Sequence, residues 1–160
     1  MLYEEKISWI QGTPLGIRIR SIEFVPTHMH ENIVEIVFCL KGGVTFSYGY
    51  EEFHLSEGEF ISVDMDAHFL SGKKDENICV SFYIDLKWFS EKYPYVTSLL
   101  FVCEGTKESG RPYPTYHHKQ LKGTLIALLF YLSTHERYGS SFRDAVICGT
   151  ERIVDSLIQN

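Results

Sequence analysis

The chain has 160 residues and a formal net charge of −6 at neutral pH, with 22% charged and 14% aromatic residues. This length suits one domain with its own hydrophobic core, and the lack of a lysine- or arginine-rich cluster argues against direct contact with nucleic acid. No apolar run is long enough to span a bilayer, and the start lacks a signal-peptide pattern. We therefore expect a cytoplasmic protein without a membrane partner.

Residues 16–84 carry the pattern of short strands separated by turns. Side chains alternate between apolar and polar over residues 17–20 and 44–50. Residues 33–40 form a nearly continuous apolar run rich in β-branched side chains, which predicts a strand covered on both faces. Many short strands at regular spacing, with glycine turns between them, are typical of a small antiparallel barrel or sandwich.

The periodicity changes after Asp85, which we expect to cap a short helix containing Trp88 and Phe89. Residues 103–114 predict a loop because they are rich in glycine and proline. Residues 115–134 then predict an amphipathic helix, and a second one begins at Ser141. Two such helices must bury their apolar stripes on the barrel, on each other or on a second copy of the chain.

Three histidines and a glutamate form the most informative pattern. His28 and His30 are one residue apart and would point to the same side of a strand, and His68 ends a later apolar strand. Glu35 can join them only if the chain bends near residues 31–32. Imidazoles and a carboxylate suit zinc, nickel, iron or manganese, but the same residues could form a polar pocket that contacts a small molecule directly.

Other residues carry weaker signals. Arg18, Arg20, Tyr48 and Tyr50 could line a barrel and bind a polyol, although a solvated exterior position is favoured slightly for at least one of the arginines. His54 is expected at the surface. The four cysteines lack a CxxC spacing, which favours buried free thiols over a zinc knuckle. No nucleophile elbow, P-loop or dinucleotide motif follows a strand, so an enzyme hypothesis depends on metal at the histidines.

The spacing His28-x-His30-x4-Glu35-x6-Gly42 resembles the first cupin motif, and residues 58–68 resemble a degenerate second one in which the usual proline is replaced near Met65. A short N-terminal arm, this barrel, and two amphipathic helices together are similar to the N-terminal effector-binding and dimerisation domain of AraC-type bacterial transcription regulators. The resemblance implies a mainly β fold, a cupin-like (jelly-roll) antiparallel β-barrel, followed by two C-terminal α-helices.

The resemblance also implies roles for segments and residues. Residues 1–15 would be the arm, residues 16–114 the effector-binding barrel with its short exit helix, and residues 115–160 the helical dimerisation segment. In such regulators a small molecule, often a sugar, binds inside the barrel. The expected binding residues are Trp9, as a lid, with Arg18, His28, His30, Glu35, Tyr48 and His68. A divalent metal is not required, but His28, His30, Glu35 and His68 are its candidate ligands.

Two functions follow as hypotheses. The first is a sensor rather than an enzyme, a homodimer that reaches DNA only through helix-turn-helix modules absent from this chain. Its expected dimer residues are Leu121, Leu125, Leu128 and Leu132. We expect the natural chain to continue past Asn160, because the last residues carry no stop signal. The alternative is a metal-dependent cupin enzyme, such as a dioxygenase or a sugar isomerase. The sensor is favoured because it also accounts for the helical last third.

Overall fold

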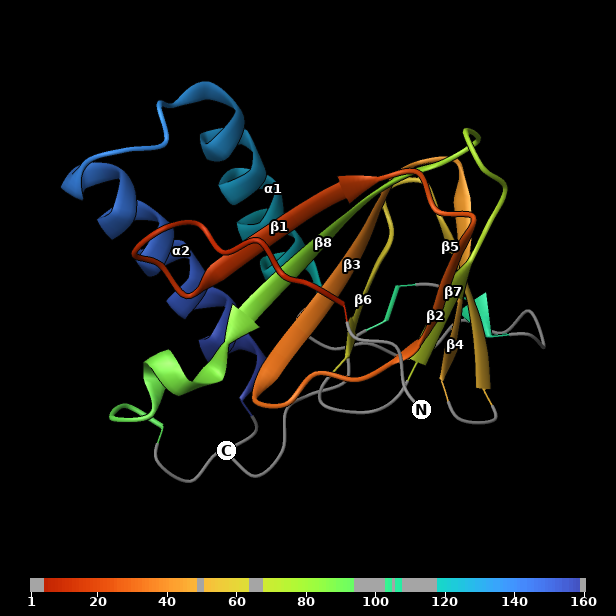
Figure 1. The fold of residues 1–160 in the computed structure, drawn as a ribbon, viewed down its shortest axis with the longest axis horizontal. Helices are drawn as coiled ribbons and strands as arrows, with labels where there is room; N and C mark the ends of the chain where they lie inside the picture. The colour runs from red at the N-terminus through yellow and green to blue at the C-terminus, as the bar shows by residue number, and fades with distance from the viewer. Residues whose placement is uncertain are drawn as a thin grey trace.

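The structure, a computed structural model, describes residues 5–48, 51–63, 68–93, 103–104, 106–107 and 118–158. Its strands form two antiparallel sheets (Figure 1). The first sheet has the order β1 (Leu15–Arg20), β8 (Ile78–Asp85), β3 (Ile33–Lys41) and β6 (Phe60–Val63). The second has the order β2 (Phe24–His28), β7 (His68–Ser71), β4 (Gly43–Tyr48), β5 (Glu51–Ser56) and the two-residue β9 (Thr106–Lys107).

The strand order identifies the fold. Strands 1, 8, 3 and 6 share one sheet, and strands 2, 7, 4 and 5 share the other, so consecutive strands of the chain repeatedly cross between sheets. This interleaving is the double-sheet jelly roll, an architecture that includes the cupins. The expected fold class is confirmed. The end of the alternating stretch at residues 49–50, part of the second motif at residues 64–67 and most of the loop at residues 103–114 lie outside the described residues.

Strand β3 separates two apolar regions because its side chains alternate between its faces. Val34, Ile36 and Phe38 belong to a core shared with the helices, whereas Val37 and Cys39 belong to the core between the two sheets. We call the first region the helix–sheet layer and the second the barrel interior. Glu35 has the parity of Val37, so the strand that packs against the helices also carries a carboxylate into the barrel interior.

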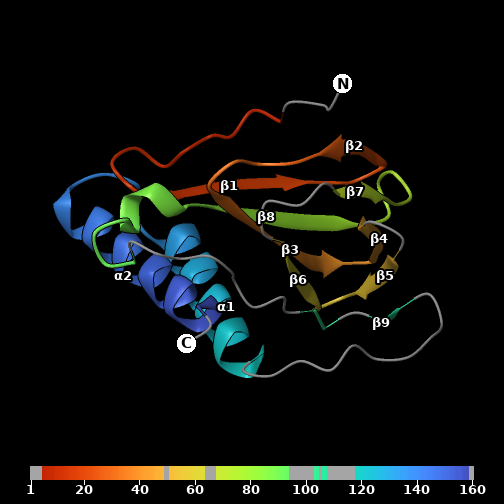
Figure 2. The ribbon, with the colours of Figure 1, turned by 90° about the horizontal axis from the view of Figure 1, so that it is seen from below.

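The helices begin after a short 3-10 turn. Asp85 caps the turn Leu86–Phe89 by accepting a hydrogen bond from the Lys87 amide at 3.0 Å, as expected. Helices α1 (His118–Thr134) and α2 (Ser140–Leu157) lie on the outer face of the first sheet (Figures 1 and 2). They bury their apolar faces there and against each other. In the first helix the buried residues are Leu121, Leu125, Leu128 and Leu132.

This placement bears on the expected dimer residues, whose role in a dimer stays a prediction. The four leucines lie in the helix–sheet layer of one chain, each at most 4% exposed, and are not available to a second copy in this structure. The four leucines pack against the first sheet and α2 of the same chain. The sequence pattern could not decide between this packing and packing against a second copy. The exposed apolar side chains of α1 are instead Ile126 and Phe130.

The N-terminal segment turns back along β1. Trp9 forms an antiparallel bridge with Gly16, and the Ile10 amide donates to the Leu15 carbonyl at 2.8 Å. Strands β1 and β2 are the edge strands of their sheets, and the segment runs along this side of the sandwich (Figure 2). Trp9 itself is 40% exposed, and its expected role as a lid stays a prediction.

Two turn residues have a positive φ that the strand connections require. Gly42, between β3 and β4, has a φ of 74°, and a Cβ there would lie 2.0 Å from the Glu76 carbonyl oxygen. Asn32 has a φ of 56° and lies immediately before β3. It provides the bend that Glu35 needs in order to rejoin the histidines.

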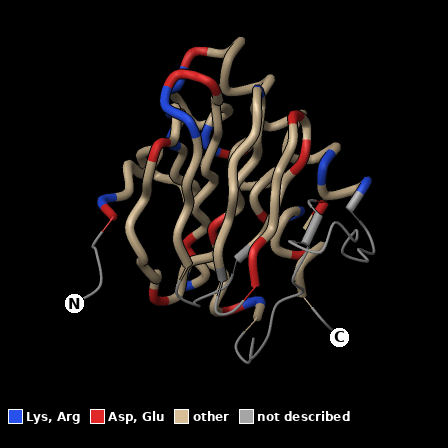
Figure 3. Tube along the Cα trace, turned by 90° about the vertical axis from the view of Figure 1, so that its right-hand side faces the viewer, with Lys and Arg blue, Asp and Glu red and all other residues tan. Residues whose placement is uncertain are grey.

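Charge and thiol placement complete the description. Lysines and arginines lie in separate short stretches with acidic residues among them (Figure 3). Within the described residues, no helix combines the length and apolar character needed to cross a membrane. Cys39, Cys79 and Cys103 are buried, as expected of the thiols, whereas Cys148 is exposed on α2.

Candidate functional site

The jelly roll brings the three histidines to one place. His28 ends β2 directly opposite His68, which begins β7. His30 follows His28 by two residues, and the bend at Asn32 returns the chain into β3 so that Glu35 faces the same interior. The proposed bend near residues 31–32 is therefore present.

Glu35 is the centre of the group. Its Oε2 atom lies 2.7 Å from His68 Nε2, 3.4 Å from His28 Nε2 and 3.5 Å from His30 Nε2. The His28 and His68 rings are 4.3 Å apart between centroids, and the Phe46 ring stacks on His68 at 5.0 Å. One carboxylate thus collects three imidazoles in a space lined on one side by an aromatic ring.

A second carboxylate comes from the N-terminal segment and was not expected. The Glu5 side chain is 0% exposed, and its Oε2 atom lies 3.4 Å from His28 Nε2. It accepts a hydrogen bond from the Tyr83 hydroxyl and lies 3.4 Å from an Arg20 guanidinium nitrogen. No local signal in the sequence indicates this, because Glu5 and Tyr83 are 78 residues apart. We call Glu5, His28, His30, Glu35 and His68 the His–Glu cluster.

The orientation of His28 is fixed by the backbone. Its Nδ1 atom lies 2.8 Å from the Pro26 carbonyl oxygen, which can only accept, so Nδ1 carries a proton and Nε2 faces both carboxylates. Burial alone would lower the pKa of His28, but the hydrogen bonds to Glu35 and Pro26 and the charges of Glu35 and Glu5 raise it.

The same contacts act on Glu35 in the opposite direction. Burial alone would raise the pKa of the Glu35 carboxyl, but the contacts from His28, His30 and His68 outweigh it and hold the pKa well below its ordinary value. The two shifts have the same cause, because the contact between Glu35 and His28 favours the ionised carboxylate and the protonated imidazole over their neutral forms.

The cluster still has unused bonding capacity. Among the described residues, His30 Nε2 and Glu35 Oε1 are buried without a hydrogen-bond partner. Buried polar atoms are normally paired, so two such atoms side by side need an explanation. A lone pair on an imidazole and one on a carboxylate are what a divalent metal ion accepts.

The donor set fits such an ion. One ligand atom each from Glu5, His28, His30 and Glu35 lies within 4.8 Å of the others, so these residues could hold a divalent metal. An ion there would be bound by the Nε2 atom of His28, since Nδ1 donates to the Pro26 carbonyl. The expected set contained His68 in place of Glu5. His68 instead forms the shortest contact to Glu35, which orients that carboxylate.

The other residues considered for ligand binding differ in burial and in distance from the His–Glu cluster. Arg18 reaches Glu5 at 3.8 Å but is 42% exposed, whereas Arg20 is nearer and more buried. Both face the barrel interior because they pair with Ser81 and Cys79 of β8. Tyr48 lies opposite His68 on β4, but its side chain and the whole of Tyr50 lie outside the described residues. His54 is exposed, as expected.

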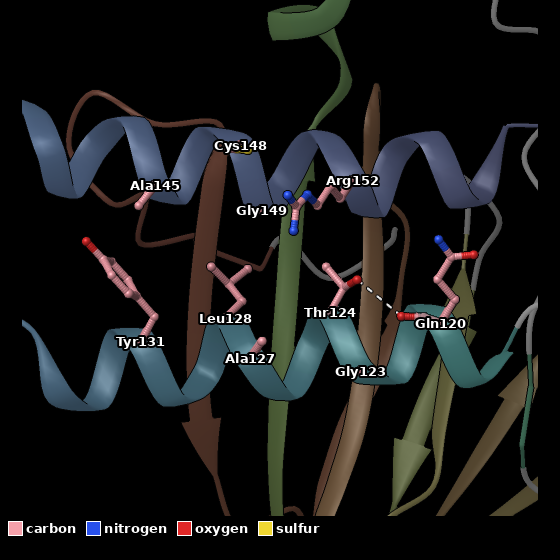
Figure 4. A pocket seen from close by; sticks show the side chains of 10 residues that line it. All are labelled: Gln120, Gly123, Thr124, Ala127, Leu128, Tyr131, Ala145, Cys148, Gly149 and Arg152. Carbon is pink, nitrogen blue, oxygen red and sulfur yellow. Dashed lines mark hydrogen bonds between the residues drawn. The ribbon is translucent and has the colours of Figure 1, made fainter.

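Apart from the His–Glu cluster, the structure has a hollow between α1 and α2, with a volume of about 520 Å³ (Figure 4). Gly149 on α2 allows Leu128 of α1 to approach, since a Cβ there would lie 3.2 Å from Leu128 Cδ1. Arg152 is the one charged side chain that lines it. The hollow lacks a convergent set of polar groups such as the His–Glu cluster offers.

Comparison with known proteins found no protein-family model and no curated protein that matches this sequence. Solved structures are similar in fold. A cupin-2 domain protein from Shewanella frigidimarina has a TM-score of 0.41 and 12% identity, over 51% of this chain and 80% of that chain. KdgF from a Halomonas species has a TM-score of 0.43 and 18% identity, over 50% and 77%. An HTH_3 family transcriptional regulator from Vibrio cholerae has a TM-score of 0.37 and 17% identity, over 45% and 43%.

These likenesses cover about half of this chain and do not bear on its activity. The strand order of the two sheets independently gives the cupin-type jelly roll. This chain is a cupin-fold domain with two added helices.

Proposed function

We propose that this chain is the small-molecule-sensing domain of a bacterial transcription regulator of the AraC type. The barrel interior binds the small molecule at the His–Glu cluster, and binding changes the position of the N-terminal segment that carries Glu5. The two helices carry the change to DNA-binding modules that follow this chain, and copies of the chain associate as a homodimer.

One observation supports this proposal above the others. The N-terminal segment contributes a fully buried side chain, Glu5, to a polar cluster inside the barrel. Occupancy of the interior and position of the segment are therefore coupled, which is what a sensor needs. A small molecule shifts such a protein only through a difference in affinity between the two positions of the segment.

Thermal-shift measurements test the binding step. The protein is screened against neutral sugars, sugar acids, other small organic acids and amino acids. A compound that raises the melting temperature of the wild-type chain, but not of a Glu35→Ala variant, supports binding at the cluster. His54→Ala is the matched control, because His54 is an exposed histidine of the same barrel. A shift that persists in Glu35→Ala would place binding elsewhere.

The coding sequence after residue 160 tests the regulatory step. A basic continuation with two helix-turn-helix patterns supports a regulator, and a stop codon would overturn it.

A second candidate function is a metal-dependent cupin enzyme, favoured by the four ligand atoms that lie within 4.8 Å of one another. A bound divalent ion would supply Lewis-acid or redox chemistry there, while Arg20 and Tyr83 would orient a substrate. Metal analysis of protein purified without a histidine tag decides this. Near-stoichiometric metal that is lost in a His28→Ala/His30→Ala variant would justify oxygenase and isomerase assays, whereas a metal-free wild type would remove this candidate.

A further inference from the structure

Glu5 occupies a site built for an anion. Its carboxylate is surrounded by the Arg20 guanidinium at 3.4 Å, the Arg18 guanidinium at 3.8 Å and His28 Nε2 at 3.4 Å. The Tyr83 hydroxyl completes the set. Guanidinium, phenol and imidazole groups are donors that together recognise a carboxylate. These four residues come from β1, β2 and β8, so the barrel supplies the site and the N-terminal segment supplies only its occupant.

Glu5 uses this site incompletely. A guanidinium and a carboxylate normally form two parallel hydrogen bonds of about 2.7–2.9 Å. Here one terminal nitrogen of Arg20 lies 3.4 and 3.5 Å from the two Glu5 oxygens. Arg20 Nε is buried and, among the described residues, has no hydrogen-bond partner. A free carboxylate could turn to meet both nitrogens of Arg20, whereas Glu5 is restrained by its own backbone.

The segment that carries Glu5 has no regular secondary structure over the described residues before Trp9. Residues 5–8 form neither helix nor strand, and the regular contacts begin at the bridge between Trp9 and Gly16. Few backbone contacts therefore oppose its withdrawal from the cluster. An occupant that binds the anion site better than Glu5 can take its place.

From these contacts we infer that the small molecule sensed by this barrel carries a carboxylate, which displaces Glu5 and binds to Arg20, His28 and Tyr83. The inference rests on the proposed function, which leaves the chemical class of the small molecule open, and it names that class. It narrows the expected sugar to a sugar acid or another small organic acid. The acid group would lie beside Glu35 and the histidines, which would then contact its remaining polar atoms.

Matched pairs of an acid and its neutral counterpart test this inference. The probes are propionate with propionamide, and glucuronate with glucose. Propionate corresponds to the whole Glu5 side chain, of which Glu5→Ala removes everything beyond Cβ, and the amide has nearly the same shape without the charge. We expect both acids to bind Glu5→Ala roughly tenfold more tightly than wild type, because the competing carboxylate is absent. The neutral compounds should bind neither protein.

Three further variants make the result specific. Arg20→Gln should weaken binding of the acids by roughly tenfold or more, the loss of a hydrogen bond to a charged group. Glu23→Ala removes an exposed glutamate outside the cluster and should bind as wild type does. If Glu5→Ala fails to fold by circular dichroism, Glu5→Gln provides the same comparison with the side-chain volume retained.

The outcomes separate this inference from the proposed function. Glucose binding to wild type, with no acid binding to Glu5→Ala, would overturn the inference that the ligand carries a carboxylate. The proposed sensing function would still stand. Acid binding that is equal in Arg20→Gln and wild type would place the acid elsewhere and overturn the inference. If none of the probes binds and no compound of the wider screen binds, both fail together.

Discussion

The two apolar regions on either side of β3 differ in how they treat polar groups. In the helix–sheet layer, the buried hydroxyl of Thr150 donates to the Val146 carbonyl of its own helix at 2.7 Å. In the barrel interior, Arg20 Nε, His30 Nε2, Glu35 Oε1 and Ser81 Oγ are buried without a hydrogen-bond partner among the described residues, whereas beside the helix–sheet layer Tyr93 Oη is such an atom. Since such atoms lower stability, their retention points to a role in binding. In the proposed function, the first layer holds the fold together and the second binds the ligand.

The largest expected effect lies in the helix–sheet layer. Leu125 is 0% exposed, so Leu125→Ala should lower the free energy of unfolding by about 2–5 kcal/mol, from lost burial and the cavity left behind. Its neighbour Ile126 is 50% exposed, and Ile126→Ala should change stability by about 0.5 kcal/mol or less. Urea denaturation measures both. Equal effects would mean that α1 does not pack as described.

A divalent cation should act on the barrel interior alone. Mn²⁺ or Zn²⁺ at 100 times its dissociation constant should raise the free energy of unfolding by about 2.7 kcal/mol. We expect the same increase in wild type and in Leu125→Ala, because distant sites act independently, and none in His28→Ala/His30→Ala. Urea denaturation with and without a chelator provides the measurement. An increase that survives the loss of both histidines would separate metal binding from the cluster.

Removing the central carboxylate should have a smaller effect than Leu125→Ala. Glu35→Gln takes a charged acceptor from His28 and His68, and should lower the free energy of unfolding by about 1–3 kcal/mol in metal-free protein. Glu23→Gln, an exposed change, serves as the control. If Glu35→Gln is instead more stable than wild type, the His–Glu cluster lowers the stability of the fold. That result would increase the contrast between the barrel interior and the helix–sheet layer.

The smallest effect is confined to alkaline pH. Burial raises the pKa of Cys79 from 9.0 to about 12. Because the folded pKa is the higher one, the contribution of Cys79 to stability is complete below pH 9.0 and is lost as the pH rises toward about 12. At pH 10 the loss should be about 1.4 kcal/mol. Wild type should therefore lose more stability between pH 7 and pH 10 than Cys79→Ala does.

The exposed thiol provides the control for this measurement. Cys148→Ala should keep the alkaline loss of wild type, because Cys148 is exposed in α2. If Cys148→Ala abolishes the loss and Cys79→Ala keeps it, the assignment to the barrel interior is wrong.

The local sequence predicted much of the candidate site. The histidine spacing, the bend before Glu35 and the separate position of His68 followed from strand periodicity and from the known reach of imidazoles. The positions of Arg20 and Tyr83 were harder to predict. Alternation shows which residues share a face of a strand, but it does not show which face becomes the barrel interior. Glu5 could not be predicted, since it meets its partners only after the N-terminal segment folds back along β1.

The sequence by itself determined the elements: short strands with glycine turns, a capped turn at Asp85, and two helices with apolar stripes. These depend on neighbours within a few residues, for which periodicity and capping are sufficient. The tertiary structure alone decided what each stripe covers. It buried Leu121, Leu125, Leu128 and Leu132 within one chain, left Trp9 40% exposed, and inserted Glu5 among Arg20, His28 and Tyr83. Those outcomes depend on contacts between residues far apart in the chain, which only the closed jelly roll brings together.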